Sequence, residues 1–330
     1  MRRRLTPALL AALLLAVALL APAALGGDAF CKACGQKLEG SYISTGADTY
    51  HHEHFTCTIC GQPLVDNYVV RDGKNYHPEC YEKHVALKCD LCGKPIHGRY
   101  IQNFWGQAYH IEHREHEPQC DHCSRFISKR LTDGGWEYED GRRICGICRK
   151  SAVKTTKEAE ALLREAAGRL GKIGLDVDTK AISLHLVGLD DIRGLAGSSS
   201  QELRGYTDYN ASTFLGITTR KEIDVYVLYG MPRESALGTM AHELMHVWQA
   251  ERGRIQNDPA FSEGSCNYAA FLVLKEYETP QARFVLNSLR KSEDTIYGDG
   301  FRRVREFAEK EGVQSWIRQL ANEDVLPSGY

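Results

Sequence analysis

The chain has 330 residues, which is long enough for two or three domains. Hydrophobic residues make up 43% of it and charged residues 25%, which is ordinary for a folded protein. A formal net charge of −2 excludes a strong global field for nucleic acid or anionic membranes, so we expect no nucleic-acid partner and look for function in local sites.

The first 26 residues have the order of a secretory signal peptide. Three arginines, Arg2–Arg4, precede an almost entirely apolar run over residues 5–25, and Ala21-Pro22-Ala23 supplies the small residues of a cleavage site. The apolar run also approaches the length that spans a bilayer, so a retained signal anchor is the alternative. We expect cleavage, a secreted or periplasmic protein, and no membrane association after cleavage.

Eleven of the twelve cysteines lie between Cys31 and Cys148, mostly in C-x2-C pairs with histidines at fixed offsets. Zinc prefers four tetrahedral Cys and His ligands, and two such pairs across a short hairpin supply them. The pattern predicts four structural zinc sites, with these ligands in chain order: Cys31, Cys34, His51 and His54; Cys57, Cys60, His77 and Cys80; Cys89, Cys92, His110 and His113; Cys120, Cys123, Cys145 and Cys148. His52 and His116 are nearby alternatives, but they would break the x2 spacing. A disulfide framework, the other interpretation, does not need histidines in register.

The spacing of the sites groups them in pairs. Only two residues separate His54 from Cys57, so the first two sites must pack together, and this unit over residues 28–84 resembles the LIM domain. Six residues separate His113 from Cys120, so we describe residues 85–150 as LIM-like. The resemblance implies a protein-binding module, and closed four-ligand sites leave zinc no position for chemistry.

From about residue 151 the composition changes, and we predict a separate domain over residues 151–330. Thr155 and Glu158 form a capping-box pattern that begins a helix ending near Gly171. A loop is expected over 188–200, and the expected strands are Ala181–Val187, Ser212–Thr219 and Glu222–Tyr229. Helices are expected from Pro232 to about Arg252 and then to the end of the chain. The predicted fold class is therefore α+β, with zinc-stapled hairpin modules followed by a small sheet and a helical bundle.

The segment His242-Glu243-Leu244-Met245-His246 is an H-E-x-x-H motif. On a helix, residues four apart lie on one face, so His242 and His246 can bind one zinc ion. Glu243 points to one side of that pair, where it can act as general base on a water whose pKa the metal lowers. An apolar stripe of Leu237, Met240, Leu244 and Val247 supports the helix.

Catalytic zinc takes three protein ligands and keeps one position open. Glu263 lies seventeen positions beyond His246, at the start of the next expected helix, and we predict it as the third ligand of a gluzincin-like site. Gly264 would let the backbone pass close to the metal. Glu251 is too near along the same helix, and Asp258 is a weaker alternative because it suits a helix cap.

Three further residues are candidates near this site. Cys266 could be a ligand or a redox-sensitive thiol, although a buried small hydrophobe is the expected role. Tyr297 and Arg302, on a glycine-rich segment, are candidates for stabilising the oxyanion of the scissile carbonyl. The predicted strand Ser212–Thr219 would be the sheet edge that binds an extended peptide.

These motifs together resemble the plant LIM-domain peptidases that limit organ size, the "DA-one" family. The resemblance covers residues 28–322 and is carried by the zinc sites and by Leu228–Pro232, Ala241–Trp248, Glu263–Cys266 and Tyr297–Arg302. It implies a zinc peptidase that cleaves proteins. This chain carries a secretion signal and no ubiquitin-interacting motif, so ubiquitin activation is not transferred and the chain looks like an exported bacterial relative.

The sequence therefore predicts a zinc-dependent endopeptidase with one catalytic and four structural zinc ions. Its expected partners are protein or peptide substrates, with the LIM modules docking a substrate or another protein. The alternative is a LIM-type adaptor that carries an inactive or inhibited peptidase fold. Glu243 favours the enzyme, because a pure scaffold gives that carboxylate no role.

Overall fold

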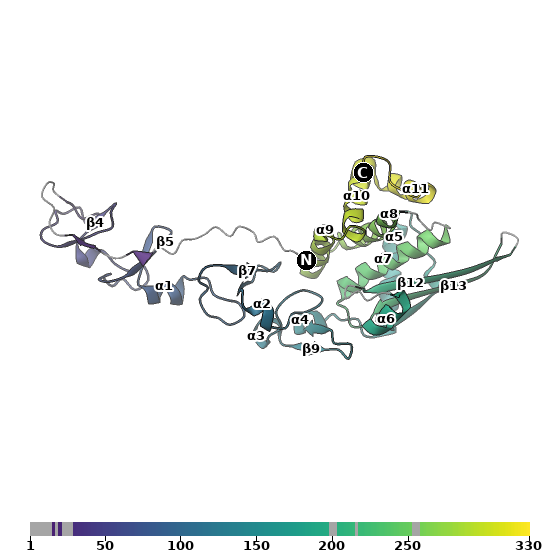
Figure 1. The fold of residues 1–330 in the computed structure, drawn as a ribbon, viewed down its shortest axis with the longest axis horizontal. Coiled ribbons are helices and arrows are strands. Elements are labelled where there is room, and N and C mark those ends of the chain that lie inside the picture. Colours follow the sequence, from purple (N-terminus) through teal and green to yellow (C-terminus); the bar gives the residue numbers. More distant parts are fainter. Residues whose placement is uncertain (1–14, 17–18, 22–28, 198–202, 215–216, 253–257) are drawn as a thin grey trace. The chain divides into compact units, whose positions relative to one another are not determined.

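The computed structural model describes residues 15–16, 19–21, 29–197, 203–214, 217–252 and 258–330 (Figure 1). It divides into two compact units, of which one ends at His116 and the other begins at Glu117. The predicted signal peptide lies outside the described residues except for two short strands, β1 (Leu15–Ala16) and β2 (Leu19–Ala21). Within the described ranges, no helix is both long and apolar enough to cross a membrane.

The unit that ends at His116 is built from short antiparallel hairpins. The hairpin strands are β3 (Tyr42–Ser44) with β4 (Thr49–Tyr50), β5 (Tyr68–Arg71) with β6 (Lys74–Tyr76), and β7 (Tyr100–Gln102) with β8 (Ala108–His110). β2 pairs with β3 and β1 pairs with β5, both antiparallel. A short helix follows each hairpin: η1 (His52–His54), α1 (Pro78–His84) and α2 (His113–His116). Each short helix carries ligand-type residues, so the hairpins place the second half of each predicted zinc site.

The C-x2-C pairs lie on tight turns that are closed in the same way each time. In the first, the Gly35 amide donates to the Cys31 carbonyl oxygen over 2.7 Å, and Gly35 adopts a φ of 72°. Glycine is favoured there because a Cβ makes this left-handed region costly. Ser124 takes the same position in the fourth pair, at a φ of 57°, and its amide donates to Cys120 over 2.8 Å. The local sequence thus sets the geometry of all four thiol pairs.

A small apolar core joins the first two zinc-type clusters. Phe55, one of the two residues between His54 and Cys57, is fully buried, and its ring lies 4.9 Å from that of Tyr68 at 84°. Ile43 and Leu64 are buried beside it. The two-residue spacer is therefore part of the packing between the clusters, which explains why two clusters form one module.

The unit that begins at Glu117 starts with the fourth cysteine cluster. This region contains α3 (Lys129–Thr132), β9 (Gly135–Glu137), β10 (Arg143–Cys145) and α4 (Gly146–Arg149). The predicted division at residue 150 differs from the compact units, because residues 117–150 cluster with the rest of the C-terminal half. Hydrogen bonds cross the predicted boundary: the Tyr138 hydroxyl donates to the Gly230 carbonyl oxygen over 3.1 Å, and Arg142 donates to that of Tyr229 over 3.0 Å.

A three-stranded sheet lies at the centre of this unit (Figure 1). Its strands are β11 (Ile182–Val187), β12 (Gly205–Phe214) and β13 (Ile217–Leu228), in the order β11-β13-β12. β13 is parallel to β11 and antiparallel to β12, so β12 is an edge strand. The segment Ser212–Thr219, expected as one strand, is divided between two: it includes the end of β12, to Phe214, and the start of β13, from Ile217. The expected loop over 188–200 contains helix α6 (Leu189–Ala196), capped by Asp191.

Helices cover one face of the sheet and form the bundle. They are α5 (Thr156–Gly171), α7 (Arg233–Glu251), α8 (Pro259–Leu274), α9 (Pro280–Lys291), α10 (Tyr297–Glu311) and α11 (Val313–Asn322), and the short turn η2 (Thr179–Ala181) precedes β11. The expected stripe on α7 is fully buried, together with Val225 and Val227 of the sheet. The chain is thus α+β, and its core is built on the helix that carries the H-E-x-x-H motif.

Candidate active site

Three predicted metal ligands meet between α7 and α8. The Nε2 atoms of His242 and His246 lie 3.2 Å apart. Oε2 of Glu263 lies 3.2 Å from Nε2 of His242 and 3.5 Å from Nε2 of His246. A tetrahedral zinc ion with bonds of about 2.0–2.2 Å separates its ligand atoms by roughly 3.3–3.6 Å. These three residues, which we call the metal triad, therefore fit one zinc ion.

The electrostatics of the metal triad fit a cation as well. Oε2 of Glu263 is buried and receives no well-aligned hydrogen bond, although both rings are within ion-pair distance. Burial alone would raise the pKa of Glu263, but the two histidines hold it far below its usual range. Burial opposes a charge on His246, yet the hydrogen bond with Cys266 and the charge of Glu263 raise its pKa well above its usual value. A negative carboxylate thus faces a position that favours positive charge.

His242 is oriented from behind by Asn267, which sequence reasoning missed. Nδ1 of His242 lies 3.0 Å from Oδ1 of Asn267, and the Asn267 amide nitrogen donates to the Tyr297 carbonyl oxygen over 3.0 Å. Because Oδ1 of Asn267 can only accept a hydrogen bond, Nδ1 of His242 carries a proton and donates to it. Such bonds fix the ring and tautomer of a metal-binding histidine. The only available signal was the position of Asn267, one helical turn after Glu263.

His246 is oriented by Cys266, whose sulfur lies 3.4 Å from Nδ1 of that ring. Burial raises the pKa of Cys266 to about 11, against the opposing effect of His246, so it stays a thiol and donates toward Gln249 over 3.7 Å. The Ser262 hydroxyl donates to the same acceptor, the side-chain oxygen Oε1 of Gln249, over 3.1 Å. The structure thus buries Cys266, as expected, and places its sulfur in one group with ligand atoms of His242, His246 and Glu263, all within 4.8 Å of one another.

Glu243 is 4% exposed as a residue, and its carboxylate lies against the edge strand β12. The Thr207 hydroxyl donates to Oε2 of Glu243 over 2.8 Å. At Gly205, a Cβ would collide with Oε1 of Glu243, so a side chain at this position would displace the carboxylate. The sequence prediction missed both residues, because β12 was placed too late in the chain. The threonine and tyrosines of residues 205–209 were the available β-strand signal.

The two oxyanion candidates have different surroundings. The Tyr297 ring stacks on His242 with 6.4 Å between centroids and 24° between planes, and burial together with the Glu263 charge raises the pKa of Tyr297 to about 12. It therefore keeps its phenolic proton. Arg302 forms an ion pair with Asp299 and donates to the Ser292 carbonyl oxygen over 2.6 Å. In the described part of the chain Arg302 makes no ion pair or hydrogen bond with the metal triad.

Two glycines allow α8, which carries Glu263, to pack closely against α10. A Cβ at Gly264 would overlap the Gly300 carbonyl group, and a Cβ at Gly300 would overlap the Ala260 carbonyl oxygen, so α8 and α10 are in backbone contact. We expected Gly264 to allow close approach to the metal. Its surroundings show a different reason, because the close approach is to α10.

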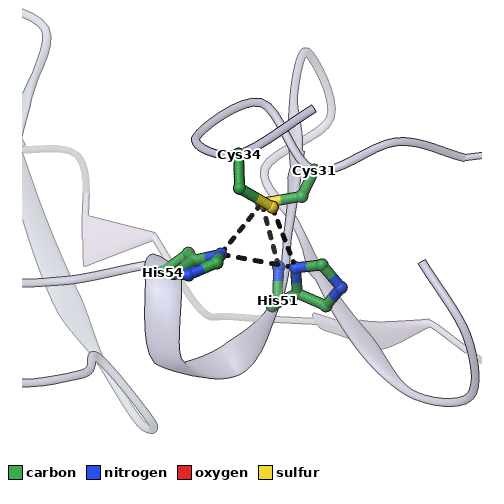
Figure 2. Close-up of side chains that lie close together, drawn as sticks. All are labelled: Cys31, Cys34, His51 and His54. Carbon is green, nitrogen blue, oxygen red and sulfur yellow. Dashed lines mark hydrogen bonds between the residues drawn. The ribbon is translucent and has the colours of Figure 1, made fainter. Parts of the chain in front are cut away.

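The four predicted structural sites are each gathered into one cluster with the predicted ligands. In the first, Cys31 Sγ lies 3.5 Å from His54 Nδ1 and Cys34 Sγ lies 3.6 Å from His51 Nδ1 (Figure 2). His52 instead lies 3.3 Å from the Ser41 hydroxyl. Against the effect of burial, backbone N–H groups lower the pKa of Cys57 to about 6, which favours a metal-binding thiolate. All twelve cysteines are free thiols.

Comparison with known proteins agrees with the N-terminal geometry. Residues 31–85 match the LIM domain. The chain carries a LIM domain and is similar to the DA1 proteins over most of its length. It is 24% identical to Protein DA1 of Arabidopsis thaliana over 73% of this chain and 57% of DA1. DA1-related 1 of the same plant is 25% identical over 90% of this chain and 66% of its own length.

The LIM domain-containing protein HDR3 of Oryza sativa subsp. japonica is 24% identical over 76% of this chain and 63% of HDR3. The chain thus spans somewhat more than half the length of these DA1-type relatives. LIM domains bind zinc and mediate contacts between proteins, so the two clusters within residues 31–85 are metal-binding sites of a recognised kind. The clusters over residues 89–113 and 120–148 have side chains that could hold a metal ion in the same way.

Proposed function

We propose that the protein is a zinc-dependent endopeptidase. The observation that carries this proposal is the metal triad, in which three ligand atoms on two helices lie 3.2–3.5 Å apart beside the glutamate of an H-E-x-x-H motif. The sulfur of Cys266 belongs to the same group of ligand-type atoms, all within 4.8 Å of one another, and lies 3.4 Å from Nδ1 of His246. We propose that His242, His246 and Glu263 are the three protein ligands, that Cys266 stays a thiol beside His246, and that one position is open.

The residues suit hydrolysis of a peptide bond. A zinc ion would supply Lewis-acid polarisation of the scissile carbonyl and would lower the pKa of the attacking water. Glu243 accepts the proton of that water and passes it to the leaving amine. Thr207 holds the Glu243 carboxylate until then. Tyr297, protonated at neutral pH, donates to the developing oxyanion in our proposal.

The substrate lies along β12 in this proposal. β12 is an edge strand, and an edge strand can take an extended peptide as a further strand of its sheet. Thr207, which binds Glu243, is on the same strand. A peptide added to this edge would therefore bring one of its bonds next to the proposed base.

The LIM domain extends the proposal to substrate choice. Its closed zinc clusters do no chemistry, and LIM domains contact other proteins, so we propose that residues 31–85 dock a substrate or a partner protein. We also propose four structural zinc ions and one catalytic zinc ion. A secreted or periplasmic location stays a proposal that rests on residues 1–26, and the N-terminal residue of the exported protein tests it.

The test compares the purified wild-type protein with a Glu243→Gln variant on an unfolded protein substrate. The glutamine side chain keeps the shape of the glutamate but cannot act as the base, so the zinc content stays equal and cleavage falls by at least about 100-fold. Equal cleavage by both proteins would exclude the enzyme. A protein that holds five zinc ions and captures a partner without cleaving it would be the LIM-type adaptor instead.

A further inference from the structure

The lead-in segment, Tyr229–Arg233, carries the chain from the sheet into α7. Its backbone carbonyls are bound by residues of the fourth cysteine cluster's region. Arg142 Nη1 donates to the Tyr229 carbonyl oxygen over 3.0 Å, and the Tyr138 hydroxyl donates to that of Gly230 over 3.1 Å. The Val153 amide donates to the Met231 carbonyl oxygen over 2.9 Å. Three consecutive carbonyls of the lead-in segment thus depend on residues 138–153.

The amides of the lead-in segment are bound from the same side. Gly230 donates to the Val153 carbonyl oxygen and Arg233 donates to that of Ser151, each over 2.9 Å. A Cβ at Gly230 would collide with the Tyr138 ring, so ring and glycine are in direct contact. Five hydrogen bonds and one ring contact therefore set the direction in which α7 begins.

The same region also contacts the segment that follows strand β11. Arg142 is 7% exposed and forms an ion pair with Asp140 at 2.8 Å. Asp140 accepts a hydrogen bond of 2.9 Å from the amide of Leu189, a residue that lies two positions after the end of β11. Arg142 and Asp140 thus link β11 and the lead-in segment through one buried ion pair.

The residues that make these contacts are themselves held by the fourth cysteine cluster. Tyr138 and Arg142 lie between Cys123 and Cys145, while Ser151 and Val153 follow Cys148. The four cysteines of this cluster are at most 2% exposed. Few apolar side chains are buried around them, mainly Phe126 and Ile144, so a bound metal has to supply much of the folding energy of this region.

We propose that the fourth cysteine cluster is energetically coupled to the metal triad. A zinc ion bound at this cluster strengthens zinc binding at the triad. The coupling element is the lead-in segment, because it fixes the start of the helix that carries His242 and His246. Binding free energies are reciprocal, so a zinc ion in the metal triad also strengthens metal binding at the fourth cluster. This inference uses one part of the proposed function, namely that the metal triad binds zinc.

The experiment uses the full chain and two variants that leave the four cysteines intact, Arg142→Gln and Tyr138→Phe. Zinc affinity at the metal triad is measured by competition with a chelator, and the triad's zinc is identified as the one lost in His242→Ala. Hydrogen exchange of the α7 amides over residues 233–241 is measured in parallel. We expect about a 10-fold loss of triad affinity, within the range of coupled sites, and faster exchange at the start of α7. Arg143→Gln is the matched control, because Arg143 is half exposed and pairs with Glu137.

Cys123→Ser and Cys60→Ser extend the test to the metals themselves. Loss of the fourth cluster should weaken the metal triad, whereas loss of the second cluster, in the other compact unit, should leave it unchanged. Unaltered affinity and exchange in both Arg142→Gln and Tyr138→Phe would overturn the inference, even if Cys123→Ser failed to fold. A wild-type chain without triad zinc would instead defeat the proposed function, and hydrogen exchange alone would then decide whether the fourth cluster holds α7.

Discussion

The hydroxyl of Thr207 donates to the carboxylate of Glu243 over 2.8 Å, and this bond joins the edge strand β12 to helix α7. The two residues are 36 positions apart. The proposed base and the proposed peptide-binding edge are thus one structural unit. A peptide that pairs with β12 would be placed relative to Glu243 by the same strand that positions the carboxylate.

Replacing Thr207 should therefore affect turnover more than binding of metal. In Thr207→Val the carboxylate loses its donor, and we expect kcat to fall about 10-fold, as small displacements of catalytic groups do. Zinc content should not change, because Thr207 contacts no metal ligand in the described structure. Thr207→Ser keeps the hydroxyl and should recover most of the activity. A loss that serine does not recover would assign Thr207 a packing role only.

The contact between α8 and α10 should be sensitive to a single methyl group. In Gly264→Ala the new Cβ overlaps the Gly300 carbonyl group, and we expect a loss of about 1–3 kcal/mol in the free energy of unfolding. Gly168→Ala in α5 is the control, since no atom lies within 4 Å of its Cβ position. That change should stabilise the chain by about 0.4–1 kcal/mol. Chemical denaturation measures both, and equal effects would contradict the close contact.

Asn267 should control zinc affinity without being a ligand. Asn267→Leu removes the acceptor for Nδ1 of His242, and loss of such a partner typically weakens metal binding about 10–100-fold. Asn267→Asp keeps the acceptor and should retain the affinity. Asn322→Leu, at an exposed position of α11, is the matched control. Chelator competition gives the affinities, and an unchanged value for Asn267→Leu would show that His242 needs no such support.

Zinc binding at the metal triad should release a proton. Without metal, the pKa of His246 is raised by Cys266 and Glu263, against the effect of burial, so the ring holds a proton below that raised pKa. Zinc has to displace this proton, and its apparent affinity therefore falls as the pH is lowered through that pKa. Calorimetry in two buffers with different ionisation enthalpies counts the protons released. A pH-independent affinity would contradict the assigned contacts of His246.

The sequence predicted those features that depend on local spacing. Four Cys and His clusters follow from C-x2-C pairs, because each pair lies on a turn defined by a few residues, such as Cys31–Gly35. His242 and His246 follow from helical periodicity. Glu263 could be named because it lies near the start of the helix that follows His246, and two consecutive helices often pack against each other.

Features set by contacts between distant segments were not predicted. Asn267 and Thr207 differ from other polar residues only by what the fold places beside them. The boundary at residue 150 was placed by composition, yet Tyr138 and Arg142 bind the backbone of Gly230 and Tyr229 across it. The segment Ser212–Thr219 was expected as one strand because its β-type composition is the same in the end of β12 and the start of β13.

In our proposal, one zinc ion is held by three side chains and keeps one coordination position for solvent. A crystal structure of the zinc-loaded protein, with anomalous scattering at the zinc edge, locates that ion. We expect a peak about 2.0–2.2 Å from Nε2 of His242, Nε2 of His246 and a carboxylate oxygen of Glu263, with solvent as the fourth neighbour. A peak bonded to the sulfur of Cys266 would close the site and contradict the peptidase, as would the lack of any zinc between the two histidines.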